Sequence, residues 1–204
     1  MTLRSHSARL LLIGQGAWFI GIVLISVVGS IFFGHFMPSL YAVVHQIGIR
    51  LVALAILIYA ISFIIPSRQS SHEVPIATKV AWITCWSFAI LLAVLLFFNV
   101  QPEALVALHL LFLGWAGTLV YGMGYLLFPA LLGRPKVSRG ASLTQLWMAV
   151  GGVSLMAIAF GAMEQLWWIP RPFVVLATGG TLATIAALLY VGFWLRKPQV
   201  TRLG

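Results

Sequence analysis

The sequence has very little negative charge and a single thiol. Its 204 residues include no aspartate, three glutamates (Glu73, Glu103 and Glu164) and one cysteine, Cys85. One cysteine excludes an intrachain disulfide, and the scarcity of carboxylates excludes a pair of acids for general acid–base catalysis. Phosphate-binding loops, nucleophile elbows and zinc-protease histidine pairs are also missing from the sequence.

Charge of either sign is rare, and long apolar runs replace it. Only 7% of the residues are charged and 62% are hydrophobic, whereas a soluble domain has about 25% charged residues. The runs are continuous rather than alternating, which favours helices over the strands of a barrel. We therefore predict an all-α integral membrane protein, a single domain over residues 1–204, with six transmembrane helices forming three hairpins. The predicted spans are about 10–34, 39–65, 79–100, 103–132, 143–163 and 172–195.

The positive charges predict how the helices cross the membrane. Ten of the twelve basic residues fall on one side of the predicted spans, which explains the net charge of +9 without a nucleic-acid partner. By the positive-inside rule both termini are cytoplasmic, and we expect a bacterial or archaeal cytoplasmic membrane. These ten residues are Arg4, Arg9, Arg68, Lys79, Arg134, Lys136, Arg139, Arg196, Lys197 and Arg202.

Two of the predicted helices carry a histidine seven residues after a proline near the helix start. Pro38 precedes His45, and Pro102 precedes His109, whereas the third hairpin has Gly179 at this position. Seven residues correspond to a depth of about 10 Å below the outer helix start. Two imidazoles at equal depth on parallel helices can serve as the axial ligands of one haem. The alternatives are neutral histidines bonded to a neighbouring helix, or a proton or quinone role.

Two further residues extend the predicted site. His35, with Met37 close by, could complete a copper site with His45 and His109, because imidazole and thioether both suit copper. Arg50 lies twelve positions after the first proline, about 18 Å along the helix by its rise, where a charge is costly. We expect it to meet a cofactor carboxylate or an acid of another subunit.

Part of the sequence resembles a known family. The segment HLLFLGWAGTLVYGMGYLLFPALLGRP, from His109 to Pro135, is similar to helices of small membrane proteins related to the haem–copper oxidase large subunit. The shared pattern is a helix-entry histidine followed by Leu-Gly-Trp, glycine, tyrosine and proline, then Gly-Arg. Gln145-Leu146-Trp147 with Gly151-Gly152 is similar to the next helix of that group, so that the resemblance covers about residues 105–160.

The resemblance implies that helix-entry histidines bind haem or copper, while the adjacent histidine pair and the later His-x-His of full oxidases are absent. Electron transfer is therefore expected rather than substrate turnover, with no catalytic residue in this chain. The prediction is a b-type haem protein with His45 and His109 as ligands near the outer face, serving other membrane or periplasmic redox subunits of a respiratory-type complex. The alternatives are a non-catalytic accessory subunit and a copper-binding membrane protein, and the glycine-rich faces also allow an oligomer.

Overall fold

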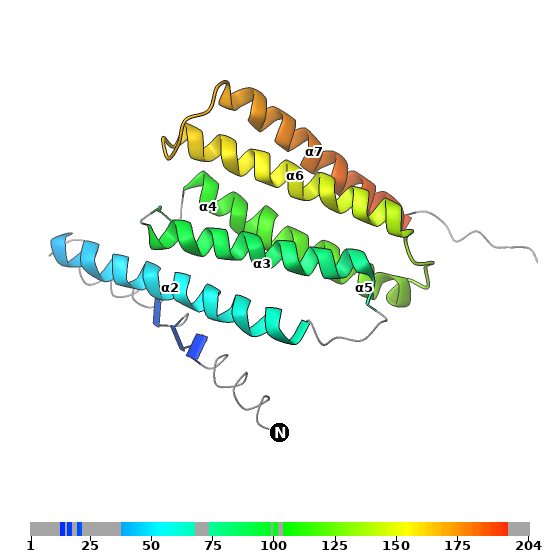
Figure 1. Cartoon of the computed structure of the whole chain (residues 1–204), viewed down its shortest axis with the longest axis horizontal. Helices are drawn as coiled ribbons and strands as arrows, with labels where there is room; N and C mark the ends of the chain where they lie inside the picture. The colour runs from blue at the N-terminus through cyan, green and yellow to red at the C-terminus, as the bar shows by residue number, and fades with distance from the viewer. Residues whose placement is uncertain are drawn as a thin grey trace, which may run out of the picture. The chain divides into compact units, whose positions relative to one another are not determined.

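The computed structural model describes residues 38–67, 74–98, 100–101 and 104–195, with positions 13–14, 16–17 and 20–21 of the first predicted span. All regular structure in this described part is helical (Figure 1). The elements are α2 (Pro38–Ser67), α3 (Ile76–Phe97), α4 (Leu105–His109), η2 (Leu110–Gly117), α5 (Thr118–Leu131), α6 (Arg139–Met163) and α7 (Pro172–Leu195).

Five described stretches are long and apolar enough to cross a bilayer, and α4, η2 and α5 together form one of them. This confirms an all-helical membrane protein over the described residues. Most of the predicted first span and both chain ends lie outside those residues. Six spans and cytoplasmic termini therefore stay predictions.

The helix boundaries follow local chemistry. α2 and α7 begin at Pro38 and Pro172, as the sequence predicts for a residue that has no N–H to leave unbonded. α6 begins at Arg139, four residues before the predicted start. Ser138 explains this earlier start, because its side-chain oxygen accepts a hydrogen bond from the Ala141 N–H at 3.4 Å and caps the first turn.

The chain divides into two compact units, and each is described by itself. The first contains residues 1–70 and 86–108, and the second contains residues 71–85 and 109–204. In the first unit α2 buries a stripe of residues three or four positions apart: Ile49, Ala53, Ile56 and Ala60. Two described glycines of the predicted first span, Gly14 and Gly21, lie against this helix, and a Cβ added to Gly21 would come within 2.8 Å of the Gly48 carbonyl oxygen.

In the second unit α6 and α7 lie side by side in close contact (Figure 1). The contact is backbone against backbone at two glycines. A Cβ on Gly152 would lie 2.6 Å from the Ala183 nitrogen and 2.7 Å from the Gly179 carbonyl oxygen, and one on Gly179 would lie 2.7 Å from the Gly152 carbonyl oxygen. Small residues that let two backbones approach are typical of membrane helix pairs.

An aromatic cluster closes one end of the second unit. Its buried members are Ala77, Tyr125, Tyr190 and Trp194. The Tyr190 hydroxyl donates to the Val120 carbonyl at 3.2 Å, and it occupies the space that a side chain at Gly124 would need. This cluster joins α3, α5 and α7 and holds the second unit together at the end that carries the α5–α6 loop.

Candidate functional site

His109 lies within a membrane-spanning stretch of the second unit and contacts α6. It is the last residue of α4 and is half-buried. Its imidazole ring centroid lies 4.2 Å from that of Phe160, with the two ring planes inclined by 36°. The contact covers part of the imidazole and fixes His109 against a neighbouring helix rather than against lipid.

A π-helical segment, η2, begins immediately after His109 and ends at Gly117. In this geometry each N–H bonds to the carbonyl five residues earlier, so each turn holds more residues than an α-helical turn. Such segments are rare and are found frequently at functional sites. The regular α-helical period of 3.6 residues is therefore interrupted directly after His109. No sequence pattern noted above predicts this segment.

Thr118 marks the return from π-helix to α-helix. Its backbone N–H donates to the carbonyls of Gly114 and Trp115, and its buried hydroxyl donates to the Gly114 carbonyl as well. A threonine hydroxyl can bond a carbonyl three or four residues earlier, in competition with the regular ladder. Thr118 thus supplies an additional donor where the hydrogen-bond pattern changes.

An apolar groove of about 270 Å³ runs along η2 and α5. Its walls come from η2 with α5, from α6 and from α7, and the residues lining it are Leu113, Gly117, Tyr121, Ala149, Val153, Met156, Gly180, Ala183, Thr184 and Ala187. His109 and Phe160 are not among these lining residues. In the sequence His109 precedes Leu113 by four residues, and Phe160 follows Met156 by four.

Glycines leave the groove walls smooth. A Cβ at Gly180 would meet nothing within 4 Å, and one at Gly117 would meet only the Phe112 carbonyl oxygen, at 3.4 Å. Gly124, which the helical wheel places on the same stripe as Gly117, packs against Tyr190 instead. Gly117 and Gly124 therefore have different surroundings, an open groove at Gly117 and helix packing at Gly124.

His45 lies on α2 in the first unit, where it is half-buried. Its neighbour Gln46 has a buried side-chain carbonyl oxygen with no hydrogen-bond donor among the described residues. The two predicted ligands, His45 and His109, belong to different units, so their pairing remains a prediction. His35 and Met37 lie outside the described residues. Within the described part no group of three or more His, Cys, Asp or Glu side chains is placed to hold a metal ion.

Arg50 is exposed on α2 and lies near the end of α3. Its guanidinium carbon is 6.0 Å from the ring centroid of Phe97, the last residue of that helix. A cation at this distance from an aromatic face gains a modest attraction. Because Phe97 is the last residue of α3, the Arg50 side chain reaches the level at which that helix ends.

Three helices of the second unit are joined by one buried glutamine. The Gln145 side chain, on α6, accepts a hydrogen bond from the Tyr125 hydroxyl at 2.7 Å and donates to the Ala186 carbonyl at 3.0 Å. It has no exposed surface. Tyr125 and Gln145 thus form a link between α5, α6 and α7.

Removing this glutamine should destabilise the second unit. We expect Gln145→Leu to lower the free energy of unfolding in detergent by about 1 kcal/mol, because the Tyr125 hydroxyl loses its buried acceptor. Tyr125→Phe should cost less in the Gln145→Leu background than in the wild type, and a double-mutant cycle measures that coupling. The exposed neighbour Thr144 provides the control, and Thr144→Val should leave stability unchanged. Additive effects in the cycle would contradict a direct bond.

No family model, curated protein or solved structure matches this chain. Its function must therefore be argued from its own residues.

Proposed function

We propose that this chain is a membrane electron-transfer protein that holds a b-type haem between His45 and His109, near the outer face of the membrane. The observation that carries the proposal is the placement of His109. This histidine packs against Phe160 of α6 and stands directly before a π-helical segment, and an apolar, glycine-walled groove lies along the same helical stretch. Neutral imidazole is a common axial ligand of haem iron.

The apolar groove fits one edge of a flat macrocycle. The groove is somewhat smaller than the 300–1,000 Å³ typical of sites that enclose a small molecule. It would therefore receive an edge of the ring system, with Gly117 and Gly180 leaving its walls flat. His45 supplies the second nitrogen, and Arg50 the cation for a propionate or for an acid of a partner subunit.

The remaining chemistry of the chain favours electron transfer over catalysis. Bound haem supplies a one-electron Fe(III)/Fe(II) couple. The protein's part is to hold the iron with two imidazoles and to keep water from it with apolar walls. Aspartate is absent and the described spans contain no glutamate within them, so no carboxylate is available there to deliver protons to a bound substrate. The resemblance to the haem–copper oxidase large subunit supports the same proposal and suggests a redox subunit as partner.

The test is spectroscopic, on the full chain purified from membranes. A reduced-minus-oxidised spectrum should show a sharp α-band, with about one haem per chain by haem extraction and little copper by metal analysis. Stoichiometric copper without haem would favour the alternative site that includes His35. A colourless, metal-free protein that co-purifies with larger subunits would reject the proposal and favour a structural accessory subunit, with Arg50 facing a partner's acid.

A further inference from the structure

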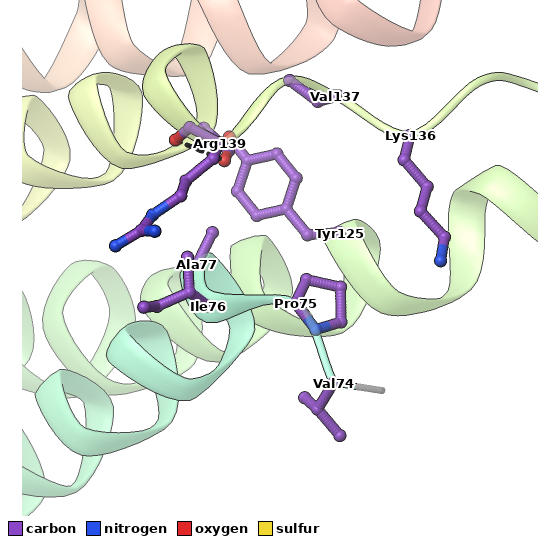
Figure 2. Close-up of a pocket in the computed structure, with 9 residues that line it drawn as sticks. Val74, Pro75, Ile76, Ala77, Tyr125, Lys136, Val137 and Arg139 are labelled. Carbon is purple, nitrogen blue, oxygen red and sulfur yellow. Dashed lines mark hydrogen bonds between the residues drawn. The ribbon is translucent and has the colours of Figure 1, made fainter. Parts of the chain in front are cut away.

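The second unit contains a half-open cavity of about 350 Å³, with both polar and apolar walls, at the end that carries the α5–α6 loop. It is lined by Val74, Pro75, Ile76, Ala77, Tyr125, Lys136, Val137, Arg139 and Ser142. Two of these are cations, and Figure 2 shows Lys136 and Arg139 on either side of the Tyr125 ring. Both cationic side chains are exposed, so a solute or a lipid headgroup can reach them.

Two helices begin at this cavity. Ile76 is the first residue of α3 and Arg139 the first of α6, and both residues line the cavity. A helix N-terminus carries partial positive charge and N–H groups without intrahelical acceptors. Neither helix has an acid in its first turn. At α3 the preceding residue is Pro75, whose side chain has no oxygen that could cap those N–H groups.

The charges around the cavity are unbalanced in the described part of the chain. Arg139 places a cation at the positive end of the α6 dipole, an arrangement that is unfavourable without an anion nearby. Lys136 adds a second cation three residues earlier. The one described acid, Glu164, lies at the opposite end of α6. Glu73 precedes the cavity in sequence and lies outside the described residues. A Glu73→Gln variant therefore tests whether this carboxylate occupies the cavity.

We propose that this cavity binds a phosphate group, carried by an anionic phospholipid or present as free inorganic phosphate. The α3 N-terminus supplies N–H donors, α6 adds the first-turn N–H groups that Ser138 does not cap, and Lys136 and Arg139 supply charge. Helix N-terminal N–H groups and cations together bind phosphate in many proteins. Basic pockets between membrane helices at the cytoplasmic face are also typical sites for acidic lipid headgroups. The proposal is independent of haem binding, because this cavity and the apolar groove along η2 and α5 have no lining residue in common.

The experiment compares lipid binding by matched variants of the full chain. Phosphatidylglycerol and phosphatidylcholine are titrated against the detergent-solubilised protein, and bound lipid is counted by native mass spectrometry. The wild type should retain phosphatidylglycerol in preference to phosphatidylcholine. Lys136→Gln and Arg139→Gln should each weaken phosphatidylglycerol binding about fivefold. Arg134→Gln removes the same charge from the same loop without touching the cavity and should have little effect.

Inorganic phosphate separates the two sources. Lipid that stays bound in excess phosphate identifies a headgroup site, whereas phosphate binding that depends on Lys136 and Arg139 without lipid retention identifies a site for the free ion. Either result supports a phosphate site. An equal loss of phosphatidylglycerol or phosphate binding in Arg134→Gln would overturn the proposal, because it would show only a general attraction to a basic surface. Binding of phosphate or lipid to the Glu73→Gln variant alone would overturn the proposal as well. It would show that the chain's own carboxylate fills the cavity in the wild type.

Discussion

Replacing His109 with alanine should remove haem from the purified protein. Even residues that only orient a metal ligand change affinity by roughly 10–100-fold, so the loss of an axial ligand should reduce bound haem at least about tenfold. His45→Ala should do the same, because haem held by one imidazole leaves an open coordination position and a weaker complex. The measurement is the α-band absorbance per protein in the reduced-minus-oxidised spectrum.

Two controls separate ligand loss from misfolding. His72→Ala removes a histidine that lies in the sequence between the predicted spans 39–65 and 79–100, and it should keep the full α-band. His109→Gly leaves room for free imidazole, and added imidazole should restore the α-band if the histidine acts only as a ligand. An α-band that survives His45→Ala but not His109→Ala would exclude His45 as the second ligand. Survival in both variants would exclude the proposed site altogether.

Adding a methyl group at Gly152 should strongly destabilise the α6–α7 pair. The new Cβ would lie 2.6 Å from the Ala183 nitrogen, and that atom belongs to the backbone, so the two helices must move apart. Overpacking of this kind costs about 1–3 kcal/mol, and loss of the close helix contact adds to it. We expect Gly152→Ala to lower the free energy of unfolding by roughly 2 kcal/mol or more.

Gly151 provides the matched control for this change. It is the neighbouring residue in the same helix, and a Cβ there would meet nothing within 4 Å. Because alanine is a better helix former than glycine, Gly151→Ala should be neutral or slightly stabilising. Gly179 and Gly180 form a second such pair on α7, with the same expectation. Equal unfolding free energies for Gly151→Ala and Gly152→Ala would contradict the backbone contact described above.

Much of the helical architecture could be predicted from the sequence because apolar length and helix-initial proline are local signals. Pro38 and Pro172 stand at the start of α2 and α7 as expected. The α6 helix begins at Arg139, four residues before the predicted membrane span, because Ser138 caps its polar first turn. Boundaries set by hydrophobic runs are thus recovered more easily than those set by a single hydrogen bond.

The site was less accessible to sequence reasoning. The His109–Phe160 contact and the Tyr125–Gln145 bond join residues on different helices, and pairing of that kind depends on helix rotation. The π segment changes that rotation without any local composition signal. A buried glutamine in an apolar helix was the one available clue, because such a residue requires a partner within the membrane.

The π segment also changes what a single inserted or deleted residue can do to this protein. One residue more or less turns an α-helix by about 100° beyond that point. In η2 the wider turns can accommodate such a change, so that α5 and the residues before Leu110 both keep the faces that they bury. A single-residue insertion or deletion in η2 should therefore disturb the bundle less than one in a regular α-helix.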